Sequence, residues 1–363
     1  MQFCDLDKQY KEYKSEIDSA IQSVIDASAF INGKEIELLE EELANYCGVK
    51  HAIAVSSGTD ALLLALMAYD LQPGDEVICP AFSFFASASM ISLLKAKPVF
   101  VDVSPLNYNI DVSKIEKAIT SKTKGIIAVS LFGQCVDFDS LNEVADKHGL
   151  WVIEDGAQSF GATYKGRKSC SLTEVSTTSF FPAKPLGCYG DGGAVFTHND
   201  DLAALIRQLR GHGQSARYFH DRVGINGRMD TIQAAILRVK LRHFDRELEI
   251  RREAAVLYSL KLNGLVLLPT IDDDYESSWA QFTIGIDKRD SVRKKLAERG
   301  IPTAVHYPLP LPKQLAFSKL TSYDKEFEVS ELLSETVLSL PMHGMITEED
   351  IDLVCNALKD IME

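Results

Sequence analysis

The chain has 363 residues, of which 46% are hydrophobic and 25% are charged, and its formal net charge is −14. This length leaves room for a large domain and a smaller one, and the acidic balance disfavours nucleic acid and anionic membranes as partners. The sequence predicts neither a signal peptide nor a membrane span, and its seven scattered cysteines favour the reduced thiols of a cytoplasmic protein over disulfides or a metal site.

Two helices are predicted first, over residues 7–27 and 34–46. A regular alternation of strands and helices follows. Short β-branched runs separated by helices of about ten residues are typical of a mainly parallel sheet covered by helices on both faces. The predicted strands cover 51–55, 76–79, 98–101, 125–129, 151–154, 175–180 and 193–197, and the helices between them begin at 57 or cover 84–95, 111–119 and 137–148.

A long amphipathic helix is expected to begin near Asp230 and to run past Leu260. It would connect a large domain, residues 1–263, to a small C-terminal domain, residues 264–363. The small domain is predicted to contain a strand, a helix, a second strand and a terminal helix. These elements are expected over 279–286, 290–299, 301–307 and after Thr347.

The most distinctive residue is Lys184, which lies in a glycine-rich segment between Pro182 and Pro185. The two prolines prevent a helix or a central strand, so the lysine is held in an irregular loop. A fixed amine, with the carboxylate of Asp155 at a strand end before it, suits a Schiff-base nucleophile that serves pyridoxal phosphate. A surface lysine in a glycine-rich turn is the commoner alternative for any single lysine.

Three further features follow predicted strands, where open parallel sheets bind their ligands. The segment Ser56-Ser-Gly-Thr-Asp60 could hold a phosphate at a helix N-terminus, although an ordinary N-cap explains the same residues. Phe84 could stack on a flat ring or belong to the core. A buried Asp155 would keep an aromatic nitrogen protonated, or it caps a strand end. Their order and placement together, rather than any one of them, predict a cofactor site.

A basic run interrupts this acidic chain between residues 207 and 228, where Asp221 is the single acid. Arginine offers the bidentate geometry that diphosphates and carboxylates favour. A solvated helix face followed by a loop is the alternative interpretation. The basic residues are Arg207, Arg210, His212, Arg217, His220, Arg222 and Arg228.

Four segments carry a specific resemblance: Ser57-Gly-Thr-Asp-Ala-Leu62, Glu154-Asp-Gly-Ala-Gln-Ser-Phe-Gly-Ala162, Ser179-Phe-Phe-Pro-Ala-Lys-Pro-Leu-Gly187 and Gly224-Ile-Asn-Gly-Arg-Met-Asp230. Together they resemble the nucleotide-sugar aminotransferases of the DegT type, and the similarity extends over essentially the whole chain. The resemblance implies the α/β fold of aspartate aminotransferase, fold type I, with a mostly parallel central sheet and a smaller C-terminal α+β domain. It also implies pyridoxal 5'-phosphate (PLP, or its amino form PMP) as cofactor and no metal.

The resemblance implies a role for each matching residue. Lys184 is the catalytic residue, which forms a Schiff base with PLP and moves a proton between substrate and cofactor. Asp155 pairs with the ring nitrogen, Gln158 contacts the ring hydroxyl and Phe84 stacks on the ring. The phosphate is held by Gly58, Thr59 and Ser179, and by Asn226 of a neighbouring subunit, which implies a homodimer with shared active sites. The implied substrate residues are Ser28, Phe30, Arg228, His306 and Tyr307.

Within the family, three stretches are most similar to members that act on a UDP-linked sugar acid: Ser130-Leu-Phe-Gly-Gln-Cys135, Lys184-Pro-Leu-Gly-Cys-Tyr-Gly-Asp191 and Ala304-Val-His-Tyr-Pro308. The resemblance therefore implies transfer of the amino group of L-glutamate to carbon 3 of UDP-2-acetamido-2-deoxy-3-oxo-glucuronate. Such a product serves bacterial surface polysaccharides such as O-antigen. The alternative is the same chemistry on a dTDP- or GDP-linked 3- or 4-keto deoxysugar.

Three other functions are disfavoured by particular residues. A sugar dehydratase of this family would replace the Schiff-base lysine, commonly by histidine, and Lys184 is present. A non-enzymatic regulator would lack a catalytic residue or carry a DNA-binding segment, whereas Lys184 and Asp155 are both present here. A dinucleotide-binding oxidoreductase would need Gly-x-Gly-x-x-Gly after the first strand, and Gly190-Asp-Gly-Gly193 lies too late in the chain.

Overall fold

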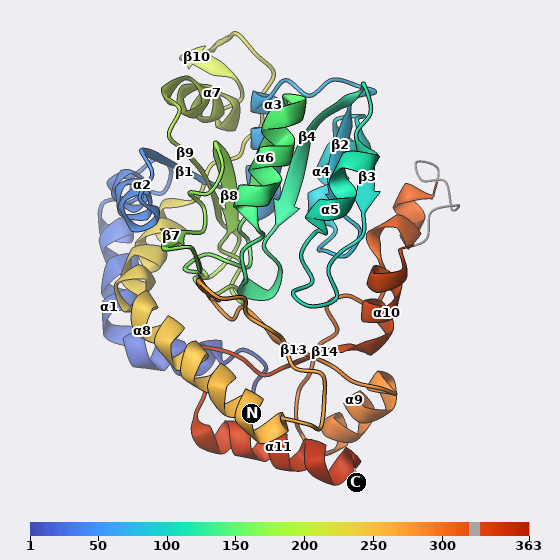
Figure 1. Ribbon diagram of the computed structural model, residues 1–363. Coiled ribbons are helices and arrows are strands. Elements are labelled where there is room, and N and C mark those ends of the chain that lie inside the picture. Colours follow the sequence, from blue (N-terminus) through green and yellow to red (C-terminus); the bar gives the residue numbers. More distant parts are fainter. Residues whose placement is uncertain (319–326, 363) are drawn as a thin grey trace.

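The computed structural model describes residues 1–318 and 327–362. A central sheet is built from β1 (His51–Val55), β2 (Glu76–Pro80), β3 (Lys97–Val101), β4 (Thr123–Val129), β5 (Trp151–Asp155), β8 (Val175–Ser179) and β9 (Gly193–Thr197). Figure 1 shows it with its helices, and the strand order is β1-β9-β8-β5-β4-β2-β3. All strands run parallel except β9, which is antiparallel to both neighbours. The predicted α/β fold with a mostly parallel sheet is confirmed.

Helices cover both faces of the sheet because its strands are buried on both sides. Residues Ile53 and Val55 of β1 share a core with α3 (Gly58–Ala68), α4 (Ala86–Leu93) and α7 (Asp200–Arg210). The intervening Ala52 and Ala54 face the other side, beneath α2 (Lys34–Cys47) and α8 (Thr231–Leu262). This alternation is the period-two pattern of a strand that is covered on both faces. The second face is completed by α5 (Val112–Ile115) and α6 (Phe138–His148).

Local sequence sets the limits of these helices. In α2 the buried residues Ile36, Leu39 and Leu43 recur at helical spacing and form one apolar face. The helix ends at Gly48, whose φ of +73° lies in the left-handed region that glycine adopts without steric cost. The predicted helix over 111–119 is shorter in the structure, where α5 passes into a single 3₁₀ turn, Glu116–Ala118.

The 32-residue helix α8 connects the two parts of the molecule and is roughly 48 Å long at 1.5 Å per residue. Its first half packs on α1 (Leu6–Asp26) and α2. Its second half, including Tyr258, shares a core with β13 (Phe282–Gly285), β14 (Val337–Leu340), α9 (Arg289–Glu298) and α11 (Glu348–Met362). The domain limits 1–263 and 264–363 stay a prediction, because this core takes residues from both sides of them.

The predicted strand over 301–307 is wrong. This segment forms one isolated bridge, from Ala304 to Ser339 of β14. Pro302 lies within the segment and Pro308 directly follows it, and both lack the N–H group that a strand ladder requires. The strand that pairs with β13 is instead β14, which the sequence analysis did not identify. It also missed α10 (Glu328–Thr336) and the short strands β6 (Thr163–Tyr164), β7 (Arg167–Lys168), β10 (Gln214–Ala216), β11 (Phe219–His220) and β12 (Tyr275–Glu276).

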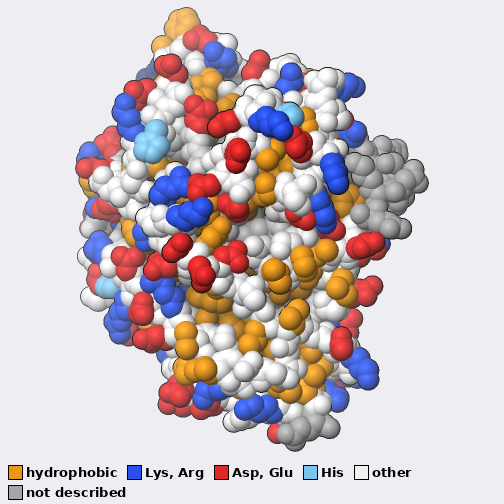
Figure 2. Space-filling model, viewed as in Figure 1, with side chains coloured by type: hydrophobic (Ala, Val, Ile, Leu, Met, Phe, Trp, Pro, Cys, Tyr) orange, Lys and Arg blue, Asp and Glu red, His pale blue; other side chains and the backbone are white. Residues whose placement is uncertain are grey.

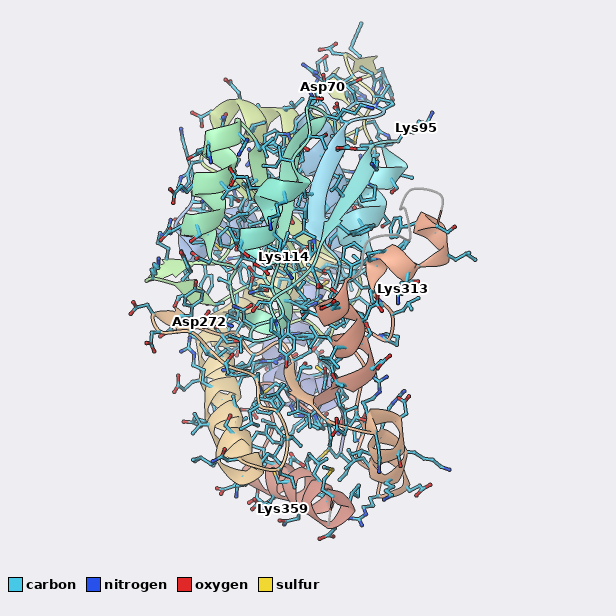
Figure 3. The ribbon with its side chains drawn as sticks, turned by 45° about the vertical axis from the view of Figure 1, so that its right-hand side comes forward. Asp70, Lys95, Lys114, Asp272, Lys313 and Lys359 are labelled. Atoms are coloured by element: carbon cyan, nitrogen blue, oxygen red, sulfur yellow. The ribbon has the colours of Figure 1, made fainter. Side chains whose placement is uncertain are left out.

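Charged and apolar side chains are distributed unevenly over the surface. In Figure 2 hydrophobic side chains gather in the middle and lower part of the face shown, below the central sheet, and charges of both signs intermix elsewhere. The labelled Asp70, Lys95 and Lys359 project outward in Figure 3. Exposed Asp272 accepts a hydrogen bond from Asn107 Nδ2 at 3.3 Å and so connects the C-terminal part to a loop beneath the sheet.

None of the helices within 1–318 and 327–362 has the length and apolar character to cross a membrane.

Candidate active site

A cavity of about 400 Å³ opens at the carboxyl ends of the parallel strands. Val129, Asp155 and Ser179, the last residues of β4, β5 and β8, line this cavity. The C-terminal part closes it from the opposite side with His306 and Tyr307. The volume falls in the range of sites that bind small organic molecules, and the position is where open parallel sheets place their ligands.

One wall of the cavity is suited to an anion. Ser57 caps α3 by accepting the Asp60 N–H at 3.0 Å, so the N–H groups of Gly58 and Thr59 lie in the first helical turn, where they have no intrahelical acceptor. A Cβ on Gly58 would lie 2.5 Å from the Cβ of Ser179. Only glycine allows the helix N-terminus to approach the end of β8 this closely. The result is a cradle of backbone N–H groups and a hydroxyl that fits a phosphate.

The floor of the cavity carries the buried carboxylate of Asp155, which is 5% exposed. Its oxygens accept hydrogen bonds from the Ala157 N–H and the Ser87 hydroxyl, both at 3.1 Å. Burial raises the pKa of Asp155, and the Ala157 N–H and the charge of Lys184 act in the opposite direction. No ion pair within the described ranges neutralises this carboxylate. A protonated ring nitrogen would supply the missing positive charge.

Lys184 lines the same cavity as Asp155. Its backbone N–H donates to the Phe181 carbonyl at 2.8 Å, which closes a tight turn that contains Pro182 and ends directly before Pro185. Burial lowers the pKa of Lys184, although the Asp155 carboxylate acts in the opposite direction. A lowered pKa increases the fraction of neutral amine, which is the nucleophilic form. The loop is also anchored by Lys240 of α8, a 2% exposed residue that donates a hydrogen bond to the Gly187 carbonyl.

Aromatic rings and a fixed amide complete the walls. Phe84 is 53% exposed, unlike a core residue, and its ring centroid lies 6.2 Å from that of Tyr307. Gln158 accepts the Phe132 N–H at 2.8 Å and donates to the Tyr307 hydroxyl at 3.1 Å, which leaves one of its amide hydrogens for a further partner. An anion cradle, an unpaired carboxylate, an amine and a flat aromatic face thus surround one cavity, and this set fits PLP.

His306 enters the cavity as a neutral imidazole. Burial and the nearby charge of Lys184 lower the pKa of His306 to about 4. Its Nδ1 lies 2.9 Å from the hydroxyl of Ser339. Because Nδ1 is engaged on the protein side, Nε2 is the ring nitrogen left for a bound molecule.

Of the predicted site residues, nine line this cavity and four do not. The four are Ser28, Phe30, Asn226 and Arg228, and the first three are exposed. The nine residues that the fold brings together are Gly58, Thr59, Phe84, Asp155, Gln158, Ser179, Lys184, His306 and Tyr307.

Two arginines of the basic run have structural partners. Arg210 pairs with Glu40 at 2.6 Å and donates to the Ala54 carbonyl at 2.7 Å. Arg207 contacts the same Glu40 at 3.4 Å and the Ala52 carbonyl at 3.3 Å. Both side chains therefore fasten α7 to α2 and β1.

Sequence analysis missed several residues that line the cavity, including Gln281, Asp191 and Phe181. Gln281 precedes β13 in an otherwise apolar stretch, and a polar residue in such a place is the signal that could have identified it. Ser87, which donates to Asp155, gave no such signal because it is one of several serines in a helix of small residues.

Comparison with known proteins identifies relatives along almost the whole chain. Residues 11–359 match the DegT/DnrJ/EryC1/StrS aminotransferase family. The chain is 48% identical over 359 residues, 99% of each protein, to UDP-2-acetamido-2-deoxy-3-oxo-D-glucuronate aminotransferase of Pseudomonas aeruginosa. It is 39% identical, over 99% of this chain and 96% of the relative, to dTDP-3-amino-3,4,6-trideoxy-alpha-D-glucose transaminase of Streptomyces venezuelae.

A solved structure of a related protein shares the fold of this chain and contains PMP. The crystal structure of NtdA from Bacillus subtilis with bound PMP superimposes with a TM-score of 0.91 at 31% sequence identity, covering 97% of this chain and 82% of that one. Together with the cavity described above, these matches establish the class of protein. The chain belongs to the DegT/DnrJ/EryC1/StrS aminotransferase family and is a PLP-dependent nucleotide-sugar aminotransferase.

Proposed function

We propose that the chain transfers the amino group of L-glutamate to carbon 3 of UDP-2-acetamido-2-deoxy-3-oxo-glucuronate, in the synthesis of a bacterial surface polysaccharide such as O-antigen. The observation that carries this proposal is the 48% identity, over 99% of both chains, to the P. aeruginosa aminotransferase whose name states that substrate. Glutamate gives up its amino group in the first half-reaction, and the keto sugar receives it in the second.

We assign different residues around the cavity to different parts of the cofactor. When bound, PLP supplies an electron-withdrawing aromatic ring that stabilises negative charge on the substrate carbon. We assign its phosphate to Gly58, Thr59 and Ser179. The carboxylate of Asp155 would hold a proton on the ring nitrogen, and a buried carboxylate without a cation partner is suited to this.

Lys184 is the residue that we assign to the proton transfers of both half-reactions. Its amine lines the same cavity as Asp155 and lies on a loop that is held between prolines and anchored at Gly187. Burial lowers the pKa of this amine, so it can accept a proton from the substrate carbon and return it. A rigid backbone keeps the amine in position while the proton moves.

We infer that a second copy of the chain completes the site. Asn226, Arg228, Ser28 and Phe30 do not line the cavity of a single chain. Phe30 and Phe181 are 47% and 51% exposed, and large apolar side chains with such exposure are suited to an interface. In a homodimer, Asn226 of the partner subunit would contact the cofactor phosphate, and Arg228 of the partner subunit would pair with the anionic substrate.

Subunit complementation tests this arrangement. Lys184→Ala and Arg228→Ala proteins, each inactive alone, should recover about a quarter of the wild-type activity when mixed and allowed to exchange subunits. This fraction follows if half of the dimers are mixed and each mixed dimer has one intact site. A mixture that stays inactive, despite mixed dimers shown by native mass spectrometry, would place both residues in the site of one chain.

The alternative substrate is a dTDP- or GDP-linked 3- or 4-keto deoxysugar. It is supported by the 39% identity to the dTDP-sugar transaminase of S. venezuelae. A uronic acid carries a carboxylate that a deoxysugar lacks, so the two substrates require different partners at the sugar ring.

A substrate panel decides between these candidates. Purified protein is incubated with PLP, L-glutamate and one keto nucleotide sugar at a time, and the products are identified by mass spectrometry. The proposal predicts an aminated product from the UDP-linked 3-oxo sugar acid, with kcat/KM at least tenfold above that for any deoxysugar. Preferred turnover of a dTDP- or GDP-linked sugar would contradict it.

A further inference from the structure

Two buried hydroxyl groups connect His306 of the cavity to the small strand pair of the C-terminal part. Thr283 of β13 and Ser339 of β14 lie directly opposite each other in the register of the two strands, and their hydroxyl oxygens are 2.9 Å apart. The Ser339 oxygen lies 2.9 Å from Nδ1 of His306. Thr283 is 1% exposed and Ser339 is 0% exposed. The three groups therefore form a continuous chain of hydrogen bonds that leads from two buried hydroxyls to the ring of His306 at the cavity.

The number of hydroxyl hydrogens favours one direction of donation along these hydrogen bonds, from Thr283 through Ser339 to His306. Each hydroxyl has one hydrogen to donate, and a buried hydrogen without an acceptor is costly. Among the residues that the structure describes, the Thr283 side chain has Ser339 as its one hydrogen-bond partner. If Thr283 donates to Ser339, then Ser339 donates to Nδ1 of His306, and every hydrogen has an acceptor. In the reverse direction, the hydrogen of Thr283 is left without a protein acceptor.

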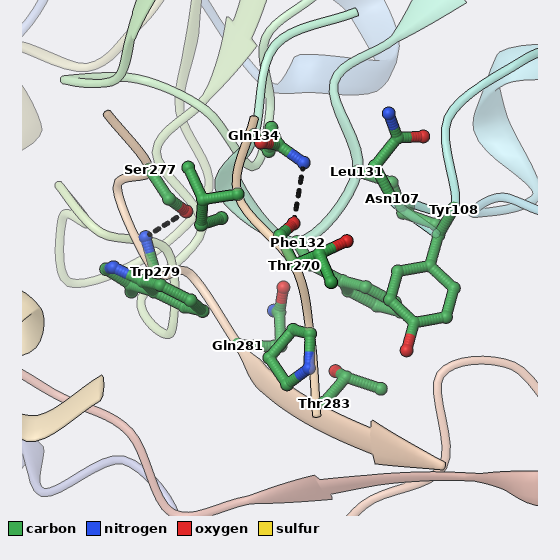
Figure 4. Close-up of a pocket in the computed structure, with 12 residues that line it drawn as sticks. Asn107, Tyr108, Leu131, Phe132, Gln134, Thr270, Ser277, Trp279, Gln281 and Thr283 are labelled. Carbon is green, nitrogen blue, oxygen red and sulfur yellow. Dashed lines mark hydrogen bonds between the residues drawn. The ribbon is translucent and has the colours of Figure 1, made fainter. Parts of the chain in front are cut away.

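The reverse direction would need a water molecule beside Thr283. Figure 4 shows Thr283 and Gln281 beside the same small cavity, which has a volume of about 20 Å³ and room for one water. The buried Oε1 atom of Gln281 has no hydrogen-bond partner there. A water in this cavity would satisfy Gln281 by donating to it, and it could also accept from Thr283. The two directions predict opposite protonation of the His306 ring.

We propose that Thr283 and Ser339 are positioning residues that hold His306 as the tautomer protonated on Nε2, so that the ring donates a hydrogen bond to an oxygen of the sugar substrate. This role rests on the proposed function, in which the substrate brings carbonyl, carboxylate and diphosphate oxygens that all need donors. The low pKa of His306 is consistent with a neutral ring, in which one nitrogen donates and the other accepts.

The tautomer can be measured without any substrate. In protein labelled with ¹⁵N-histidine, long-range ¹H–¹⁵N spectra distinguish a ring protonated on Nε2 from one protonated on Nδ1, and the His306 signals are assigned as those missing from His306→Gln. The proposal predicts the Nε2–H form in the wild type and a mixture of forms in Ser339→Ala. An Nδ1–H ring in the wild type would overturn it, whichever nucleotide sugar the enzyme uses.

Kinetics test the consequence for the substrate. Thr283→Val removes the first hydroxyl with little change of shape, and it should raise the KM for the sugar about tenfold, the effect of weakening one hydrogen bond. The rate of the glutamate half-reaction should stay unchanged, and Thr283→Ser should restore the KM. Ser334→Ala is the matched control, because it removes a buried hydroxyl that bonds the Ser330 carbonyl within α10. Equal effects of Thr283→Val and Ser334→Ala on KM would contradict a positioning role.

The two experiments separate failure of this inference from failure of the proposed function. If no UDP-linked sugar acid is turned over, the proposed function fails, and the tautomer measurement still decides the direction of the hydroxyl chain. If the substrate is turned over but the ring is protonated on Nδ1, the positioning role fails alone.

Discussion

The two walls of the cavity are built in different ways. The wall assigned to the cofactor consists of strand ends and a helix N-terminus of the central sheet, with Gly58 and Ser179 in direct backbone proximity. The wall assigned to the sugar consists of His306, Tyr307 and Gln281, which lie outside the central sheet. The first wall is positioned by the hydrogen-bond ladder of a seven-stranded sheet, and the second by single side-chain hydrogen bonds such as that between Ser339 and His306.

This difference has a consequence for catalysis. Both half-reactions need the cofactor wall, so its substitutions should impair glutamate and sugar alike. In the proposed function the sugar wall contacts the nucleotide sugar, so its substitutions should raise the KM for the sugar and leave the glutamate half-reaction unchanged. Separate measurement of the two half-reactions therefore tests the division of the site.

The largest effect is expected from Lys184→Arg. Arginine keeps the positive charge but cannot be deprotonated near neutral pH, so it cannot move a proton. We expect a loss of at least about 10³-fold in both half-reactions, measured by stopped-flow absorbance of the cofactor. An equal loss should not follow from Lys165→Arg, a change at an exposed lysine of the same protein. Retained glutamate turnover in Lys184→Arg would remove the lysine from its assigned role.

Asp155→Asn should have the next largest effect. The amide has nearly the same shape as the carboxylate but cannot stabilise a proton on the ring nitrogen, and the loss of one such electrostatic contact costs about 10²–10³-fold in rate. The two half-reactions should slow by similar factors. A variant that slows only sugar amination would show that Asp155 belongs to the sugar wall.

Gly58→Ala should weaken cofactor binding more than it changes the rate at saturation. The added methyl group would lie 2.5 Å from the Ser179 Cβ, so the anion cradle must widen. We expect the Kd for PLP to rise at least tenfold, which corresponds to about 1.4 kcal/mol and is within the usual cost of overpacking. Gly211→Ala is the control, because its methyl group would have no neighbour closer than 3.7 Å. Equal PLP affinity of Gly58→Ala and the wild type would contradict the cradle.

The smallest effect concerns stability in acid. Burial lowers the pKa of both His306 and His343 to about 4, from 6.5 in the unfolded chain. As the pH falls from 6.5 toward 4, the unfolded chain binds protons that the folded chain does not, so the free energy of unfolding falls. His343→Gln should reduce this fall by about 2 kcal/mol between pH 7 and pH 5, measured by urea denaturation, and should leave the KM for the sugar unchanged. Identical pH dependence of variant and wild type would contradict a buried neutral His343.

Much of the cofactor wall could be predicted from the sequence because its signals are local. The prolines around Lys184 and the small residues after β1 restrict the backbone over a few positions, and the strand pattern places Asp155 and Ser179 at neighbouring strand ends. Such short-range patterns determine both the element and the edge of the sheet at which it ends.

The sugar wall could not be predicted in the same way because its contacts join distant parts of the chain. Ser339 contacts His306 and Thr283 across sequence separations of 33 and 56 residues. The ion pairs of Arg207 and Arg210 could not be predicted either, because both arginines pair with Glu40, which is far from them in the sequence. The segment 301–307 has the composition of a strand. Because Pro302 and Pro308 cannot donate backbone hydrogen bonds, the segment forms a single bridge, between Ala304 and Ser339.

The most direct test of the central claim is to find the lysine that binds the cofactor. Reduction of the PLP-loaded enzyme with borohydride fixes an imine between cofactor and lysine, and peptide mass spectrometry then locates it. The account predicts that the added mass of the reduced cofactor is found on the peptide containing Lys184. Modification of Lys240, a buried lysine that anchors this loop, with Lys184 left unmodified, would contradict it.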